Sequence, residues 1–502
     1  MRKNFFIFGI SVLILTTIIY MFFDVGLLLI LFIAIILGLG YANSIQHKHA
    51  ILRNFPVLGY FRYLFEMISP EIQQYFIERA TDGKPFSRNE RSLAYQRSKD
   101  IDSTTPFGTQ LNINDSNYEG IKHSIFPAVV KKELPRVLVG GPECTQPYLA
   151  SLLNISAMSF GSLSENAILA LNKGALKGNF YHNTGEGGLT DFHLQGGDVT
   201  WQIGTGYFGC RNESGGFDSI KFAEKANFPT VKMIEIKLSQ GAKPGHGGVL
   251  PAAKNTEQIA KIRGVLPHTT ILSPPGHSAF SDTKGLVQFV ATLRQLANGK
   301  PIGFKLCIGK TNEFEAICEE MILQNCYPDF ITVDGAEGGT GAAPLEFTDG
   351  VGMPFEPALI FVNKTLIRFG IRNKMRLIGS GKIISGYSIL RAVALGADMC
   401  NSARGFMFSL GCIQALRCNT NTCPTGVATQ DKMLMKGLVV TDKSERVFHF
   451  HKNTLHAANE LLAAAGKDSF SDVDISIFMR GDEFSHLSDL YFPDNLKSVT
   501  HY

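Results

Sequence analysis

Eight short apolar or β-branched runs recur between residues 152 and 403. They cover residues 152–156, 179–183, 231–238, 269–273, 302–306, 330–334, 375–379 and 399–403, and helical patterns separate most of them. Strands that alternate with helices are typical of a parallel sheet, and eight such strands favour closure into a barrel. We therefore expect an α/β fold, a (β/α)8 TIM barrel, with functional residues in the loops after its strands.

Glycine-rich loops follow the last two runs. They read Gly379-Ser380-Gly381-Lys382 and Ser402-Ala403-Arg404-Gly405, and a helical run over 387–395 separates them. Loops of this kind let backbone N–H groups reach a phosphate, and barrels frequently hold phosphate after strands seven and eight. The alternative is a pair of turns that need positive φ.

Three cysteines follow these loops with the spacing C-x5-C-x4-C. Cys412, Cys418 and Cys423 precede Pro424, and no histidine lies between Cys412 and Gln430. Thiolates bind iron–sulfur clusters, and a proline after the last ligand is a familiar neighbour. A tetrahedral zinc site would need a fourth ligand. The pattern favours a three-thiolate cluster over three inert buried thiols.

Two apolar runs, 5–23 and 25–42, open the chain and are separated by Asp24. Each is just long enough to cross a bilayer as a helix of about twenty residues. A signal peptide is the alternative, but a second run follows directly and no clear cleavage site appears. Basic residues flank both outer ends, so the positive-inside rule places both termini in the cytoplasm. We expect a protein of the inner or plasma membrane with a cytoplasmic catalytic domain.

Composition supports this compartment and argues against nucleic acid as a partner. The net charge of the 502 residues is only +4, with 18% charged residues. Nine cysteines without paired spacing indicate a reducing environment and no disulfide framework.

The remaining sequence suggests four regions. These are a transmembrane hairpin (1–45), a connecting region and barrel extension (46–150), the barrel with its cysteine loop (151–435) and a C-terminal helical extension (436–502). Residues 49–76 are aromatic and amphipathic, which fits either the membrane surface or packing on the main domain. Residues 79–119 are polar and turn-rich, as expected for an extension that wraps the barrel or for a linker.

The stretch CIQALRCNTNTCPTGVATQ, from Cys412 to Gln430, resembles the cluster loop of the synthase domain of the glutamate synthase large subunit. The resemblance runs from about Leu152 to Gln430. It implies FMN and a [3Fe-4S] cluster held by Cys412, Cys418 and Cys423. It also implies that ammonia is added to 2-oxoglutarate, with reduction.

The same resemblance implies a set of flavin-binding positions. Ala157, Met158 and Ser159 follow the first run, before a capping box expected over 162–165 that opens a helix. Lys305 resembles a family lysine, and a cation at that point would stabilise a reduced flavin ring. The loop after 330–334 resembles the family's glycine-rich flavin loop, with Glu337 in place of Asp. The positions carried over are Gly338, Gly339, Gly341, Gly379, Gly381, Ala403, Arg404 and Gly405.

Substrate positions are implied by a K-x5-K-P-G-x-G-G signature. Lys237, Lys243 and Arg263 fall on substrate-binding positions, and Glu186 lies in a loop that borders the substrate in the family. Lys243 and Glu186 are the candidates for catalysis, and Lys237 and Arg263 are the candidates for binding carboxylates. Two lysines six residues apart suit a dicarboxylate or a developing anion.

Two departures from the family pattern concern the substrate. His246 replaces a glutamate, and Val249 replaces a glutamine that helps to hold 2-oxoglutarate. A site that loses a hydrogen bond discriminates strongly against its former ligand. Neither a glutaminase domain nor a nicotinamide-binding βαβ unit is recognisable. Ammonia and electrons are therefore expected from outside, the electrons from a ferredoxin or a reductase subunit.

The expected function is reductive amination of a 2-oxo acid by a membrane-anchored, glutamate synthase-like flavoprotein oxidoreductase acting on CH–NH2 donors. Two alternatives remain. One is an amino-acid-oxidising flavoprotein with the same cofactors, and the other is an electron-transfer or scaffold subunit without a substrate of its own.

Overall fold

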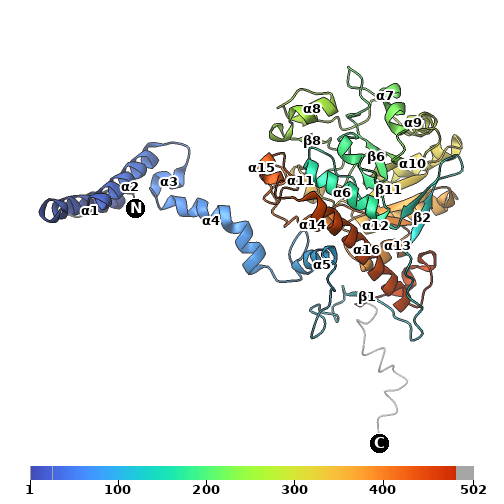
Figure 1. Ribbon diagram of the computed structural model, residues 1–502, viewed down its shortest axis with the longest axis horizontal. Coiled ribbons are helices and arrows are strands. Elements are labelled where there is room, and N and C mark those ends of the chain that lie inside the picture. Colours follow the sequence, from blue (N-terminus) through green and yellow to red (C-terminus); the bar gives the residue numbers. More distant parts are fainter. Residues whose placement is uncertain (1, 25, 482–502) are drawn as a thin grey trace, which may run out of the picture. The chain divides into compact units, whose positions relative to one another are not determined.

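The computed structural model describes residues 2–24 and 26–481. It divides the chain into two compact units, one ending at Lys84 and the other beginning at Pro85 (Figure 1). The boundary falls within the region 46–150 that the sequence suggests as one connecting segment. The two units are described separately.

The N-terminal unit is helical. It contains α1 (Arg2–Phe23), α2 (Leu27–Ile45), α3 (Ala50–Asn54), α4 (Gly59–Ile72) and a π-helical turn, η1 (Gln73–Ile77). Helices α1 and α2 pack side by side, and the chain reverses between them at Asp24 and Gly26, which have φ of 51° and 99°. Both helices are long and apolar enough to cross a membrane, although a signal sequence passes the same test. The aromatic stretch 49–76 forms α3, α4 and most of η1.

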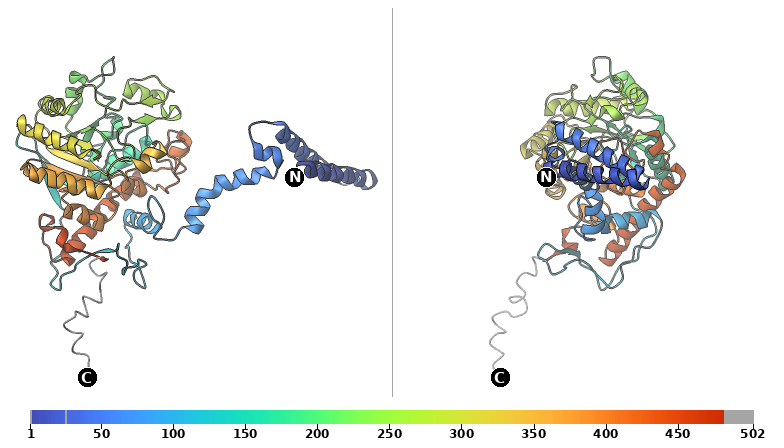
Figure 2. Two further views of the ribbon diagram at one scale, coloured as in Figure 1. Left: turned by 180° about the vertical axis from the view of Figure 1, so that it is seen from behind. Right: turned by 90° about the vertical axis from the view of Figure 1, so that its left-hand side faces the viewer.

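The second unit is built on a closed barrel. Within its described residues, eight parallel strands pair in the order β4-β5-β6-β7-β10-β11-β12-β13, and β13 pairs with β4 to close it. Figures 1 and 2 show the helices around these strands. The strands are β4 (Leu153–Ile155), β5 (His182–Asn183), β6 (Val199–Ile203), β7 (Val231–Lys237), β10 (Ile302–Leu306), β11 (Phe330–Asp334), β12 (Arg376–Ser380) and β13 (Met399–Ser402). The predicted (β/α)8 fold is confirmed.

One of the eight predicted strands is wrong. The run 269–273 supplies β9 (Ile271–Leu272), which pairs antiparallel with β8 (Val249–Leu250) outside the barrel. The third barrel strand is β6, which the sequence analysis missed because polar Thr200 and Gln202 interrupt it. Inside the barrel, Gln202 Nε2 donates to Glu235 Oε1 at 2.6 Å, so a buried carboxylate satisfies this polar residue.

Helices follow most barrel strands. They are α6 (Glu165–Gly178), α7 (Ser219–Ala226), α8 (Glu257–Arg263), α9 (Thr283–Leu296), α10 (Thr311–Leu323), α11 (Leu345–Gly350), α12 (Phe355–Arg368), α13 (Gly386–Ala394) and α14 (Arg404–Ser409). Short 3-10 turns occur at η2 (Asp191–His193), η3 (Ala252–Lys254), η4 (Arg372–Lys374), η5 (Phe470–Asp472) and η6 (Ile475–Ile477). The capping box expected over 162–165 is wrong by two residues. The N-cap of α6 is Ser164, whose side chain accepts from the backbone N–H of Ala167.

Segments before and after the barrel pack on its outside. They comprise α5 (Arg88–Ser98), the hairpin of β2 (Arg136–Val139) and β3 (Tyr148–Ser151), α15 (Lys432–Met435), α16 (Val440–Ala464), and a pair of β1 (Glu119–Ile121) with β14 (Phe478–Arg480). Helix α16 packs against α5, α6 and α13. Part of the polar region 79–119 is therefore an ordered extension of the barrel unit. The suggested extension 436–502 contains α16, and its last residues, 482–502, lie outside the described part.

Candidate active site

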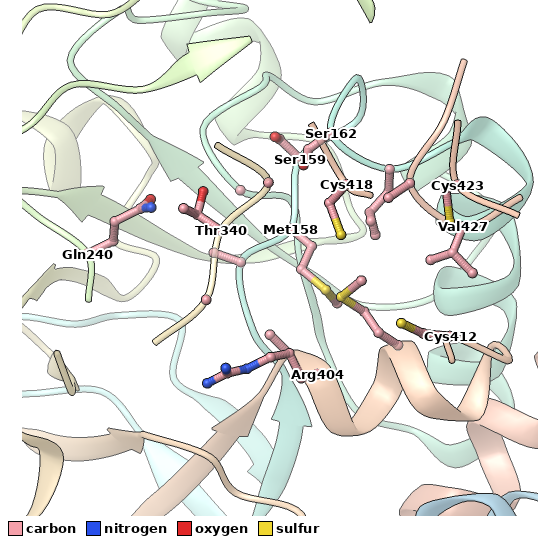
Figure 3. Close-up of a pocket in the computed structure, with 18 of the residues that line it drawn as sticks. Met158, Ser159, Ser162, Gln240, Thr340, Arg404, Cys412, Cys418, Cys423 and Val427 are labelled. Carbon is pink, nitrogen blue, oxygen red and sulfur yellow. The ribbon is translucent and has the colours of Figure 1, made fainter. Parts of the chain in front are cut away.

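The carboxyl ends of the barrel strands open into a cavity of about 260 Å³. Strand register brings its first functional residues together, because Lys237 at the end of β7 pairs directly with Lys305 in β10. The predicted residues that line this cavity are Ala157, Met158, Ser159, Glu186, Lys237, Lys243, Arg263, Lys305, Gly339, Gly341, Ala403, Arg404, Cys412, Cys418 and Cys423. Loops from both halves of the barrel thus contribute to a single space (Figure 3).

A buried ion pair lies at one end of the cavity. Lys237 Nζ lies 2.6 Å from Glu186 Oε1, and both side chains are largely buried. Burial alone would raise the pKa of Glu186, but the Lys237 ammonium, with Arg263 and Lys243, outweighs burial and lowers it. Burial lowers the pKa of Lys237, and Glu186 opposes this effect. Glu186 is therefore an ionised carboxylate among cations, not the solvated loop residue that a lone glutamate usually is.

Lys243 is held less firmly than Lys237 and Arg263, the other two cations near Glu186. It is 2% exposed, and its Nζ donates to the backbone carbonyl of Ala342 at 2.9 Å. Burial, reinforced by the charge of Lys237, lowers the pKa of Lys243 to about 8. A lysine with this pKa can both bind an anion and exchange a proton near neutral pH.

Arg263 is held from two sides. Its Nη2 donates to Phe160 O at 3.0 Å, and its guanidinium lies over the Phe208 ring at 5.0 Å. Its Nε is a buried donor without a protein partner among the described residues. A fixed guanidinium with spare donor capacity suits a carboxylate ligand.

His277 forms a hydrogen bond with the backbone of Lys237. Its Nε2 lies 2.9 Å from Lys237 O, and its Nδ1 lies 3.0 Å from Tyr207 Oη. Burial lowers the pKa of His277 to about 4, so the ring is neutral. Because a carbonyl only accepts, Nε2 donates to Lys237 O and Nδ1 accepts from Tyr207. No motif in the sequence marks His277 as a site residue.

A second polar group lies where β10, β11 and β12 end. Lys305 Nζ is 3.7 Å from Asp334 Oδ2, and Asp334 also accepts from Ser380 Oγ at 2.8 Å and from Gly241 N at 2.9 Å. The loops approach so closely that a Cβ on Gly241 would lie 1.8 Å from Gly335 O. Gln240, which the sequence analysis did not single out, lines both this region and the main cavity.

A smaller cavity of about 60 Å³ lies beside the two glycine-rich loops. It is lined by Gly338, Gly381 and Gly405, and it shares Ala157, Lys305, Gly339, Ala403 and Arg404 with the main cavity. A Cβ on Gly381 would lie 2.4 Å from Phe355, so this position needs glycine. Gly379 does not line either cavity; it lies inside β12 with its α-carbon against the Phe355 ring.

The three cysteines line the main cavity beyond Met158 (Figure 3). Burial raises the pKa of Cys412 to about 12 and also raises that of Cys418. Burial would raise the pKa of Cys423 as well, but hydrogen bonds from Thr425 and from backbone N–H groups lower it. Gln414 N also donates to Cys412 Sγ at 3.5 Å. N–H donors directed at sulfur stabilise thiolates, as a thiolate-ligated group requires.

No set of three His, Cys, Asp or Glu side chains in the described part of the chain is arranged to hold a single metal ion. The thiols are instead spread around a shared space. Three cysteine sulfurs that line one cavity are the donor type that iron–sulfur groups use.

Lys254, which the sequence analysis missed, ties the cysteine loop to the barrel. Its Nζ donates to the carbonyls of Ser162, Cys418 and Ala428 at 2.5, 3.2 and 3.1 Å. This lysine is 1% exposed. The residue lies in η3, where no motif marks it, and only the fold brings these three carbonyls together.

Residues 119–468 match the conserved region in glutamate synthase. The chain belongs to the glutamate synthase family. The glutamate synthase large subunit-like protein YerD of Bacillus subtilis is 38% identical over 466 residues, covering 84% of this chain and 88% of that protein. The archaeal glutamate synthase [NADPH] of Methanocaldococcus jannaschii is 35% identical over 64% of this chain, which spans 60% of that relative. The chain is thus a glutamate synthase-like member of an oxidoreductase family.

Solved structures show only distant likeness. A mandelate oxidase variant with an FMN adduct has a TM-score of 0.42 at 13% identity, over 78% of this chain and 91% of that one. A flavocytochrome b2 variant with pyruvate bound has a TM-score of 0.43 at 11% identity, over 88% and 91%.

Proposed function

We propose that this protein reductively aminates a 2-oxo acid, using FMN, a [3Fe-4S] cluster, ammonia and electrons from an external ferredoxin or reductase subunit. The observation that carries the proposal is one cavity that contains both a cluster of buried cations and three cysteine thiols. The cations suit a carboxylate substrate, and the thiols suit an electron-transfer group. Family membership supports the same reaction class.

FMN fits the barrel end as a flat ring with a phosphate tail. Ala157, Met158, Ser159 and Lys305 would border the ring, and the small cavity lined by Gly338, Gly381, Arg404 and Gly405 would take the phosphate. When bound, FMN supplies hydride transfer. The protein contributes Lys305, whose cation stabilises negative charge at the ring, and Asp334, which holds that lysine in place.

The cysteine loop would hold the [3Fe-4S] cluster through Cys412, Cys418 and Cys423. The fit rests on the shared cavity and on the N–H donors directed at the sulfurs of Cys412 and Cys423. Lys254 would keep the loop beside Ser162, which lines the main cavity.

Substrate chemistry would centre on four side chains. Arg263 and Lys237 would bind carboxylate oxygens, because both are charged and fixed by buried partners. Glu186 keeps Lys237 charged and is placed to attract the ammonium or imine nitrogen. Lys243, with its pKa lowered to about 8, would pass a proton to the substrate.

Substrate choice would differ from that of typical family members at Val249. This residue lines the cavity with an apolar side chain, in the position of a family glutamine. A 2-oxo acid with a smaller or less polar tail than 2-oxoglutarate would therefore bind better.

The N-terminal unit would attach the enzyme to the inner or plasma membrane with its catalytic unit in the cytoplasm. Support comes from α1 and α2, which are long and apolar, and from the basic residues that flank them.

The test uses full-length protein, purified anaerobically in detergent. We expect FMN, iron and acid-labile sulfide, and reoxidation of the reduced flavin by a 2-oxo acid only when ammonia is present. Zinc alone, or absence of flavin, would contradict the cofactor assignment. Flavin reduction by an amino acid without any reductive amination would favour the amino-acid-oxidising alternative.

A further inference from the structure

We propose that Phe86 and Tyr95 form a clamp that positions the cysteine loop and joins it to the small cavity of about 60 Å³ beside the glycine-rich loops, called here the phosphate cavity. These residues precede residue 119, where the match to the conserved region begins. The inference rests on the proposed function, because it assigns a role toward the cofactors named there.

Phe86 contacts the cysteine loop through its backbone. Its N–H donates to Gln414 Oε1 at 3.2 Å, and Gln414 Nε2 donates back to Phe86 O at 3.2 Å. Both residues are buried, at 1% and 8% exposed. Two bonds between one backbone position and one amide fix the register of the two segments, so Gln414 cannot move without breaking both.

The ring of Phe86 faces the phosphate cavity, which it lines. The guanidinium of Arg404 lies 4.7 Å from the ring centroid, and Lys382 Nζ lies 5.9 Å from it. Both distances fall within the range of cation–π contact. One residue therefore touches the cysteine loop with its backbone and the cations beside the phosphate cavity with its side chain.

Helix α5 completes the clamp about two turns further along. A capping box of Ser87 and Glu90 starts the helix directly after Phe86. Tyr95 Oη then donates to the backbone carbonyl of Cys412 at 2.6 Å. The helix also packs against α14 and α16, which gives the clamp a rigid support.

These contacts hold in place the backbone N–H group of Gln414, which donates to the sulfur of Cys412. The side chain of Gln414 is hydrogen-bonded to the backbone of Phe86. Two residues earlier, the backbone carbonyl of Cys412 accepts from Tyr95 Oη. Both ends of the segment that carries this N–H group are therefore fixed. Hydrogen bonds to ligating sulfur stabilise the more negative, reduced form and so raise the reduction potential. The clamp residues are positioning residues for this bond.

Two variants loosen the clamp without changing a ligand. Gln414→Met keeps the side-chain length but removes both bonds to Phe86, and Tyr95→Phe removes the bond to the Cys412 carbonyl. The matched control is Tyr387→Phe, which removes hydrogen bonds to Glu119 on the outside of the barrel. All three are prepared as full-length protein, and circular dichroism and flavin content report folding.

The measurement is a redox titration of the cluster, followed by electron paramagnetic resonance, together with iron content. We expect a lower cluster potential, or loss of iron, in Gln414→Met and Tyr95→Phe, with wild-type values in Tyr387→Phe. Wild-type potential and iron in both clamp variants would overturn the clamp while leaving the proposed function intact. Wild-type protein without iron or sulfide would overturn both.

Discussion

The buried lysines in the cavity differ in how strongly their surroundings stabilise the charged form. Glu186 forms an ion pair with Lys237, whereas Lys243 donates to the neutral carbonyl of Ala342 and feels the charge of Glu186 more weakly. Desolvation therefore dominates at Lys243 and lowers its pKa to about 8. Because the pKa is lowered, the ammonium is charged below about pH 8 and neutral above it.

This ionisation predicts a pH-dependent affinity for the 2-oxo acid. We expect KM to rise as pH increases through 8 in the wild type, because Lys243 loses its charge. Lys243→Gln should raise KM on the order of ten- to a hundredfold and abolish this pH dependence, since a charged hydrogen bond contributes about 1.5 to 3 kcal/mol. The exposed Lys432→Gln is the control. A KM that stays constant from pH 7 to 9.5 in the wild type would contradict this role.

Val249 lines the cavity with an apolar side chain. Restoring a polar group by Val249→Gln should improve 2-oxoglutarate binding roughly tenfold, from one added hydrogen bond to a charged ligand. Flavin reoxidation with ammonia and a panel of 2-oxo acids measures the preference. Tight use of 2-oxoglutarate by the wild type, unchanged in the variant, would show that Val249 does not govern substrate choice.

At the scale of elements, the cysteine loop has no regular structure to hold it. Side chains from other elements hold the loop in place. The main one is Lys254 from η3, whose ammonium donates to three backbone carbonyls. A loop with fewer internal hydrogen bonds than a helix or strand needs such external partners.

Lys254→Met tests this dependence. The methionine fills a similar volume but leaves buried carbonyls without a donor, which costs about 1 to 3 kcal/mol for each group left unsatisfied. We expect a lower midpoint in denaturant and a lower iron content. The exposed Lys432→Met on α15 is the matched control. If both variants keep the wild-type midpoint and iron content, the loop does not depend on Lys254.

At the scale of the whole molecule, the two units have different surfaces. The barrel unit buries its apolar residues in one core, whereas α1 has no buried residue at all. Phe8, Met21 and Leu28 are 74%, 79% and 82% exposed. Exposed apolar surface of this kind is typical of helices that another apolar surface or a bilayer covers, which supports the proposed membrane attachment.

The proposed topology predicts which sites are reachable from outside the cell. An impermeant maleimide should label Asp24→Cys, at the turn between α1 and α2, on intact cells. It should not label Ser214→Cys in an exposed loop of the barrel unit until the cells are opened. Labelling of Ser214→Cys on intact cells would reverse the topology.

Local patterns in the sequence were enough to predict the barrel, the two glycine-rich loops and the cysteine loop, because these rest on strand periodicity, glycine spacing and the spacing C-x5-C-x4-C. The sequence patterns placed seven of the eight barrel strands and missed β6, where Thr200 and Gln202 alternate with apolar residues and leave no apolar run.

The contacts that hold the site together arise in the folded chain and could not be predicted from the sequence. Glu186 became an ion-pair partner because β5 and β7 end at the same side of the barrel, and Lys254 gained three carbonyls from segments far apart in the sequence. Phe86 reached Gln414 across more than three hundred residues. Such contacts depend on burial and on convergence of distant loops, and neither leaves a periodic or spaced signal in the chain.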